Sequence, residues 1–166
     1  LKKQIDKKIK NFFKILNNQY KHIVILLSGG LDSAIIANYA RKYFKKNCFA
    51  VTAQYSPNSL LKKKLISKDL KVSKLICKNL KIKHRAVLFN DTFIKSNLKK
   101  ILYSCQDWRD YNVHCAVINF ACAKFIKSRF KNKKLAVVTG DFMNEFFADY
   151  DEVLFKKKIY YKQLRT

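Results

Sequence analysis

Residues 22–33 read HIVILLSGGLDS, and residues 34–44 continue the stretch as AIIANYARKYF. The apolar, β-branched run at 22–27 predicts a buried parallel strand, and the Ala-rich segment after Ser33 predicts a helix. Two of the three glycines of the chain, Gly29 and Gly30, lie in the turn between them. A strand, a glycine turn and a helix N-terminus together form a site for an anion, because backbone N–H groups converge there and the helix dipole adds partial positive charge.

The side chains of this turn indicate which anion it binds. Ser28 and Ser33 supply hydroxyl donors, whereas the carboxylate of Asp32 would repel a phosphate unless a Mg²⁺ ion lay between them. The turn lacks the spacer and the Gly-Lys-Ser/Thr ending of a Walker loop, and it lacks the Gly-x-Gly-x-x-Gly pattern of a dinucleotide fold. It therefore predicts a phosphate site of another kind, with Mg²⁺ held by Asp32.

Composition limits the class of protein. The chain has 166 residues, of which 49% are hydrophobic, and this predicts one globular domain over residues 1–166, which can be a fragment of a longer chain. No apolar run approaches the roughly 18 residues of a membrane helix, and the first residues lack the apolar centre of a signal peptide. The 5 cysteines form no Cys-x-x-Cys pair, which argues against a zinc or iron–sulfur site and indicates reduced thiols in a cytoplasmic protein.

The net charge of +25 suggests RNA as a partner. Lysine, asparagine, isoleucine, phenylalanine and tyrosine are all abundant, as an AT-rich gene would produce, and the basic residues are spread along the sequence. We therefore favour genome composition as the source of the charge, and RNA is the less favoured partner.

Hydrophobic periodicity predicts alternating strands and helices. Strands are expected at 22–27, 48–54, 84–89 and 135–138, and helices at 2–18, 32–44, 68–80, 92–103 and 112–130. This alternation with short connections predicts an α/β fold with a doubly wound, mostly parallel sheet and helices on both faces. Residues expected to face inward are Leu70, Ser73, Leu75, Ile76 and Leu80 in one helix and Cys115 and Cys122 in another, and His84 is expected to be structural.

Two further segments fall near the expected site. Ligands of open α/β sheets lie beyond the carboxyl ends of the strands, which places residues 54–56, and with them Ser56, near the phosphate site. Residues 105–116 (CQDWRDYNVHCA) are dense in polar and aromatic side chains at the start of a long helix. They form either part of the site or a loop fixed by an ion pair of Arg109 with Asp110.

The end of the last expected strand repeats the pattern of the first turn. Residues 135–138 (LAVV) are followed by residues 139–150 (TGDFMNEFFADY), which places a glycine and acids at the carboxyl end of a buried strand. Such acids would lie across the cleft from the first turn and could share its Mg²⁺.

The first turn resembles the Ser-Gly-Gly-x-Asp-Ser loop of the PP-loop ATP pyrophosphatase superfamily, and the second loop narrows the choice. Residues 139–150 resemble, without gaps, the asparagine synthetase segment Ser-Gly-Asp/Glu-Gly-x-Asp-Glu-Leu-Phe-Gly-Gly-Tyr. The resemblance extends over about residues 20 to 150 and implies an adenine nucleotide alpha hydrolase-like fold. In the second loop it holds at Gly140, Asp141, Glu145, Phe147 and Tyr150.

The resemblance implies ATP and Mg²⁺ as cofactors and a role for each matching residue. Asn144 stands where the family has a second Mg²⁺-binding aspartate, and a neutral amide is a weaker ligand for this cation, so that either Glu145 takes over or the metal site is altered. The implied nucleotide-binding residues are Ser28, Gly29, Gly30, Leu31, Asp32, Ser33, Ser56 and Gly140; the implied catalytic residues are Asp141 and Glu145; and the implied metal ligands are Asp32, Asn144 and Glu145.

The function implied by the resemblance is that of an ATP-dependent carbon–nitrogen ligase, which adenylates a carboxylate, releases pyrophosphate and forms an amide. Its expected partners are a small-molecule carboxylate and an amine or ammonia donor. No cysteine precedes Cys48, so ammonia from glutamine would need a glutaminase domain or subunit outside this sequence. The alternatives are NAD synthetase-like amidation, a tRNA-modifying PP-loop enzyme of the lysidine or thiouridine type, and a degenerate ATP-binding protein.

Overall fold

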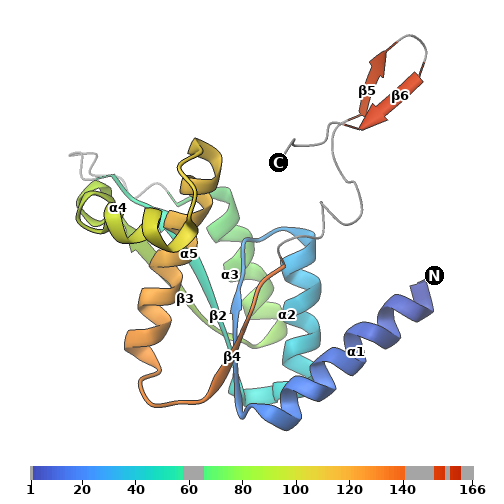
Figure 1. The fold of residues 1–166 in the computed structure, drawn as a ribbon. Coiled ribbons are helices and arrows are strands. Elements are labelled where there is room, and N and C mark those ends of the chain that lie inside the picture. The colour runs from blue at the N-terminus through green and yellow to red at the C-terminus, as the bar shows by residue number, and fades with distance from the viewer. Residues whose placement is uncertain (1, 58–65, 141–151, 156–157, 162–166) are drawn as a thin grey trace.

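The computed structural model describes residues 2–57, 66–140, 152–155 and 158–161. Four strands and five α-helices alternate through residues 2–140 (Figure 1). Their bounds are α1 Lys2–Gln19, β1 His22–Leu26, α2 Leu31–Phe44, the short 3₁₀ helix η1 Lys45–Asn47, β2 Cys48–Tyr55, α3 Lys68–Leu80, β3 Lys83–Phe89, α4 Asp91–Cys105, α5 Asp110–Arg129 and β4 Leu135–Val138.

The four strands form one parallel sheet in the order β3-β2-β1-β4. The chain builds outward from β1 to β2 and β3 and then returns to add β4 on the other side of β1. The strand order therefore reverses beside β1, and ligands of open α/β sheets bind at such a switch point, outside the carboxyl ends of the strands. The predicted α/β class with a parallel sheet is confirmed.

Helices cover both faces of this sheet because successive strand side chains point to opposite faces. In β1, Ile23 and Ile25 are fully buried among residues of α1, α2 and α3, whereas Val24 is buried against Cys122 and Ile126 of α5. Figure 1 shows α5 on one side of the sheet and α1 and α2 on the other. A third cluster joins α4 and α5 to the end of β3 through Phe89, Ile101, Val117 and Ala121.

One expected inward position in α3 is wrong. Leu75 is 58% exposed, whereas Leu70, Ser73 and Cys77 are buried. These buried positions are three and four residues apart, so they form one stripe of the helix, and Leu75 lies off it. A small serine fills the centre of the stripe because α3 lies close to the end of β1 at this point, as the hydrogen bonds of Ser73 show below.

Residues after 150 received no assignment from the sequence. There the structure has two short antiparallel strands, β5 Glu152–Phe155 and β6 Lys158–Tyr161. Within the described part of the chain, no helix combines the length and the apolar character needed to cross a lipid bilayer.

Candidate functional site

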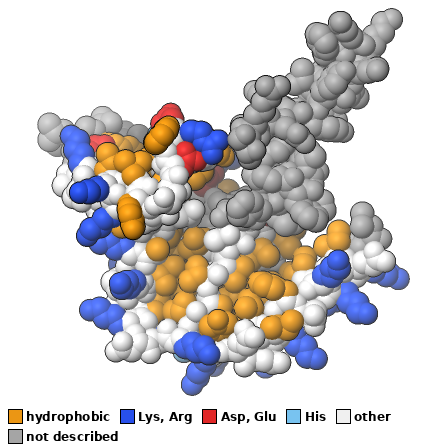
Figure 2. Space-filling model, in the orientation of Figure 1, with side chains coloured by type: hydrophobic (Ala, Val, Ile, Leu, Met, Phe, Trp, Pro, Cys, Tyr) orange, Lys and Arg blue, Asp and Glu red, His pale blue; other side chains and the backbone are white. Residues whose placement is uncertain are grey.

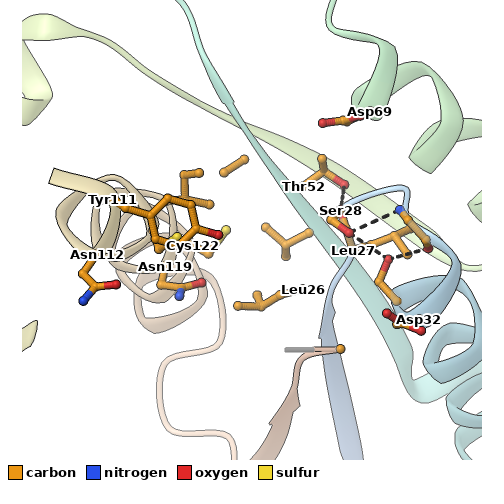
Figure 3. Close-up of a pocket in the computed structure, with 17 residues that line it drawn as sticks. Leu26, Leu27, Ser28, Asp32, Thr52, Asp69, Tyr111, Asn112, Asn119 and Cys122 are labelled. Carbon is orange, nitrogen blue, oxygen red and sulfur yellow. Dashed lines mark hydrogen bonds between the residues drawn. The ribbon is translucent and has the colours of Figure 1, made fainter. Parts of the chain in front are cut away.

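A cavity of about 670 Å³ opens at the carboxyl ends of the strands, between the turn after β1 and helix α5. Figure 3 shows Tyr111, Asn119 and Cys122 of α5 on one side of this cavity and Ser28 and Asp32 on the other. Its described lining comprises Leu26, Leu27, Ser28, Gly30, Asp32, Ser33, Val51, Thr52, Ala53, Asp69, Tyr111, Asn112, Cys115, Ile118, Asn119, Cys122 and Gly140.

The backbone of the turn after β1 requires glycine at one position, Gly29. Gly29 has a φ of +91°, and a Cβ atom there would lie 2.8 Å from the carbonyl oxygen of Asp69 in α3. Gly30 is the N-cap of α2, and no side chain caps this helix. The first N–H groups of a helix have no acceptor inside it, so the amides of this uncapped turn are available to an anion.

The two serines of the turn hold it together. Ser33 Oγ donates to the Gly30 carbonyl at 3.0 Å, and the Ser28 and Ser33 hydroxyls lie 3.0 Å apart. Because the Ser33 proton is used on Gly30, the bond between the hydroxyls takes the proton of Ser28. The Gly30 amide in turn donates to Ser28 Oγ at 3.3 Å. Both hydroxyl protons thus form hydrogen bonds within the turn, and the donors that remain for a ligand are the backbone N–H groups at the start of α2.

A buried polar chain ties this turn to the sheet. The Leu27 carbonyl, the last before the turn, accepts from Thr52 Oγ1 at 2.7 Å and from Ser73 Oγ at 3.3 Å. The Thr52 hydroxyl donates its only proton to the Leu27 carbonyl. In the 2.8 Å contact between Thr52 Oγ1 and His84 Nε2, the histidine nitrogen is therefore the donor. Burial, together with Lys74, lowers the pKa of His84, which favours the neutral ring. His84 therefore supports the site from the next strand, a structural role.

The end of β4 presses against the start of α2. A Cβ atom on Gly140 would lie 2.9 Å from the Ser33 amide nitrogen and 3.2 Å from the Asp32 carbonyl carbon. The two glycine turns found in the sequence therefore meet in space, although more than a hundred residues separate them. Any side chain at position 140 would crowd the Ser33 amide in the first turn of α2.

The charge of the described lining is negative. It includes the carboxylates of Asp32 and Asp69 and no lysine, arginine or histidine, although the chain carries 36 lysines and arginines. A bound phosphate would find positive charge at the α2 N-terminus and would need a cation to screen the carboxylates. Within the described residues, no group of three or more His, Cys, Asp or Glu side chains could hold a metal. Asp32 fits as one ligand of Mg²⁺, and the rest of the magnesium site stays a prediction.

The α5 wall is polar and uncharged. Asn112, Cys115, Asn119 and Cys122 are three or four residues apart and line the cavity from one face of the helix. Cys115 is exposed there, so its expected place in the core is wrong, whereas Cys122 is buried and burial raises the pKa of its thiol to about 11. The seven-residue spacing placed both cysteines on one face correctly, but at Cys115 that face borders the cavity.

The loop before α5 is fixed by Asp107. Its carboxylate accepts from Arg109 Nη2 at 2.7 Å and from Arg109 Nε, and it also accepts from Asn112 Nδ2. These bonds hold the pKa of Asp107 well below its ordinary value. Arg109 thus pairs with Asp107 instead of Asp110, which lies 3.4 Å from His114. Because Asn112 lines the cavity, its hydrogen bond to Asp107 also fixes one side chain of the cavity wall.

The predicted site residues divide into three groups. Those that line the cavity are Ser28, Gly30, Asp32, Ser33 and Gly140, and Gly29 and Leu31 belong to the same turn without lining it. Ser56 borders a separate hollow beside Asn90 and Phe93, and its amide donates to the Phe89 carbonyl, so its contact with a nucleotide remains a prediction. Asp141, Asn144 and Glu145 lie outside the described residues, and their roles also stay predictions.

Tyr111, Asn112 and Cys115 of the lining lie in the segment 105–116 that the sequence offered as part of the site, whereas Asn119, Cys122, Asp69 and Thr52 were not expected there. The spacing of Asn112, Cys115, Asn119 and Cys122 was a readable signal, because it marks one helix face that starts beside the polar loop. Asp69 occupies the first turn of α3, as Asp32 does in α2, but no glycine turn draws attention to it. Thr52 had no signal, since a threonine within a strand is ordinary.

The family model of asparagine synthase matches residues 18–165 of the chain. The chain belongs to the asparagine synthase family. Among curated proteins, none has a sequence that matches it. The resemblance stated from the two loops is therefore confirmed at the level of the family.

Solved structures of NAD synthetases share the fold. The NH3-dependent NAD synthetase from Campylobacter jejuni is 21% identical with a TM-score of 0.52, and the match covers 80% of this chain and 54% of that one. The glutamine-dependent NAD+ synthetase from Acinetobacter baumannii, solved with ADP, is 11% identical with a TM-score of 0.51, and the match covers 76% and 23%. The chain thus spans about half the length of the first synthetase and less of the second.

Proposed function

We propose that this domain binds ATP through the turn after β1 and activates a carboxylate by adenylation, as a step toward an amide. The observation that carries the proposal is the uncapped N-terminus of α2, which faces a cavity of about 670 Å³ and has Gly140 against its first turn. Membership of the asparagine synthase family supports ATP as the nucleotide. Complexed ADP in the Acinetobacter synthetase is consistent with it.

In the proposed reaction, a carboxylate oxygen of the substrate bonds to the α-phosphorus of ATP, and the bond from that phosphorus to the pyrophosphate oxygen breaks. The amides at the start of α2 bind the phosphate oxygens and stabilise the charge that the leaving pyrophosphate gains. Asp32 and the predicted ligands Asn144 and Glu145 would hold Mg²⁺, which screens phosphate charge when bound. An amine or ammonia then attacks the acyl carbon and AMP leaves.

The second substrate lies, in this proposal, against the α5 wall. Asn112 is held by Asp107, so its side-chain amide is oriented before a ligand arrives. Asn119 lies about two turns further along the same face of α5. Amide side chains offer both donors and acceptors, which suits the polar groups of an amino acid or a similar small molecule. Positioning of the carboxylate near the phosphate would supply much of the rate enhancement.

The test measures pyrophosphate release with ATP, Mg²⁺, ammonia or glutamine and a panel of carboxylates that includes aspartate and nicotinic acid adenine dinucleotide. We expect Asp32→Asn to lower kcat/KM by about a hundredfold or more. Asp110→Asn removes the same charge from a side chain that is 92% exposed and does not line the cavity, and it should leave turnover unchanged. Full activity of Asp32→Asn, or no release with any carboxylate, would contradict the proposal.

A further inference from the structure

Lysines gather at the end of the sheet that lies opposite the cavity. Each loop that enters a strand of the parallel sheet carries at least one exposed lysine, and these four loops contain no aspartate or glutamate. We call this group the basic edge. Its members are Lys21 before β1, Lys45 and Lys46 before β2, Lys81 and Lys83 around the start of β3, and Lys131, Lys133 and Lys134 before β4.

Strand register places these loops side by side. His22 of β1 pairs with Leu135 of β4, and Phe49 of β2 pairs with Lys83 of β3. Neighbouring strands lie about 4.8 Å apart, so the four loops form a row of roughly 15 Å. Lys21 and Lys133, from two neighbouring loops, both lower the pKa of the half-buried His22, after burial as the larger cause. The fold thus brings together lysines that are far apart in the sequence.

The charge of the basic edge is not neutralised by the described residues. Their ion pairs join Lys10 to Asp6, Arg109 to Asp107 and His114 to Asp110, and none involves the basic edge. The first turns of α2, α3, α4 and α5 each carry an aspartate, and all of them lie at the cavity end. In Figure 2 the lower edge of the molecule shows lysine and arginine groups without acidic ones. Helix dipoles favour acids in first turns and lysines after last turns, where these loops begin, so the proposal rests on the row that the loops form and on the lack of acidic partners.

We propose that the basic edge binds the phosphate backbone of a nucleic acid without sequence specificity. Lysine binds phosphate as a point charge, so a row of lysines can pair with the evenly spaced phosphates of a nucleic acid backbone. The four loops contain none of the large exposed apolar side chains of the described residues, so nothing there would enter a lipid bilayer or stack on bases. Contacts to phosphates alone carry no sequence information.

This surface acts apart from the cavity. The eight residues of β2 separate the two ends of the sheet, a length of about 26 Å. Phosphate contacts at the basic edge are therefore separate from the residues of the proposed site of adenylation. The inference is independent of the proposed function, because it rests on the loops before the strands.

The test uses the full chain and a fluorescein-labelled single strand of 20 uridines, with anisotropy measured from 50 to 300 mM KCl. One variant combines Lys21→Gln, Lys46→Gln, Lys83→Gln and Lys133→Gln, one lysine from each loop; Lys134 is kept because its Nζ lies 5.4 Å from the Tyr20 ring centre. The matched control combines Lys71→Gln, Lys95→Gln, Lys99→Gln and Lys100→Gln, which are exposed on α3 and α4. Both variants lower the net charge from +25 to +21.

In a plot of the logarithm of the binding constant against log[KCl], the slope is negative, and we expect the first variant to make it less steep by about 3. Its Kd at 0.1 M KCl should rise about tenfold or more. The control should change each value much less, and circular dichroism should show both to be folded. If the first variant does not fold, Lys46→Gln with Lys83→Gln should give half the change in slope. Equal losses in both variants, or tighter binding to vesicles of phosphatidylcholine and phosphatidylserine than to RNA, would overturn the proposal.

Discussion

The carboxyl and amino ends of the parallel sheet make sharp changes of chain direction with different residues. All three glycines of the chain lie at the carboxyl end, and one of them, Gly29, has a positive φ. At the amino end, Lys81 and Asn132 adopt positive φ with ordinary side chains. The difference lies in crowding, because Cβ at Gly29 or Gly140 would strike backbone, whereas Lys81 is exposed. Glycine is required where backbone meets backbone, and that is where the cavity forms.

The largest effect on stability is expected from Gly29→Ala. With φ at +91° and the Asp69 carbonyl 2.8 Å from the new Cβ, this change should lower the free energy of unfolding by about 3 kcal/mol. Gly30→Ala is the matched control, since Gly30 has a φ of −74° and its Cβ would meet Ser28 Oγ at 3.4 Å. Urea unfolding of both variants measures the difference. Equal stability of the two would break the comparison, because crowding would then not be the reason for glycine.

A smaller loss is expected from Thr52→Val. This change removes the hydroxyl that joins His84 to the Leu27 carbonyl and should lower the free energy of unfolding by about 1–3 kcal/mol. Thr52→Ser keeps the hydroxyl and should retain most of the stability. Urea unfolding of both variants compares them, and pyrophosphate release shows whether the turn moves. Loss of stability in Thr52→Ser equal to that in Thr52→Val would mean that the methyl group, and not the polar chain, supports the turn.

The pKa values of His22 at the amino end and of His84 beneath the glycine turn are shifted in the same direction. Burial lowers the pKa of both His84 and His22 from the ordinary 6.5, so below that pH the unfolded chain binds more protons than the folded chain. Their contribution to stability is therefore complete above pH 6.5 and is lost as pH falls through the folded pKa values. His84→Gln should flatten the rise in the free energy of unfolding between pH 5.5 and 7.5, and the slope that remains belongs partly to His22.

The control for this pH effect is His114→Gln, because the His114 side chain is 73% exposed and its partner Asp110 is more exposed still. Urea unfolding of this variant over the same pH range shows how much of any change comes from the loss of a histidine as such. If His84→Gln leaves the pH dependence of the free energy of unfolding unchanged, the polar chain beneath the turn does not contain a neutral histidine.

The smallest effect is expected at the amino end. Lys81 ends α3 in the left-handed conformation, with φ 54° and ψ 45°, which glycine adopts without cost. Lys81→Gly should raise the free energy of unfolding by up to about 1 kcal/mol. Lys78→Gly, in the last turn of the same helix, should instead lower it by about 1 kcal/mol. Thermal unfolding separates the two signs, and destabilisation by Lys81→Gly would mean that the lysine side chain itself stabilises the loop.

Sequence reasoning identified every strand and α-helix of residues 2–140 but not the short 3₁₀ helix η1, because apolar runs and turn residues mark most of these elements. The bounds moved by one or two residues; α5, for example, begins at Asp110 instead of 112. The strand order could not be deduced, since pairing of β1 with β4 depends on surfaces that are far apart in the chain. Leu75 was misplaced because hydrophobicity was given more weight than helix geometry, in which Leu70, Ser73 and Cys77 share a face.

The conformation of the first turn was predictable because the strand, the glycines and the helix start are neighbours in the sequence. Gly140 was singled out from its own motif, but its contact with the Ser33 amide depends on the sheet order. The supporting chain of His84, Thr52 and Leu27 crosses three strands and leaves no local pattern. The basic edge was missed for the same reason: its lysines are spread over the sequence and adjacent only in the fold.

The position of β4 has a consequence for the order of folding. Strands β1, β2 and β3 follow one another along the chain and can pair as neighbours, but the other edge of β1 stays open until β4 arrives, after α4 and α5. Pairings between distant segments close large loops and are slow to form. We therefore expect the contact of Gly140 with α2 to form late in folding. The glycine turn can form while the chain is still short, but the cavity beside it would be complete only after β4 has paired with β1.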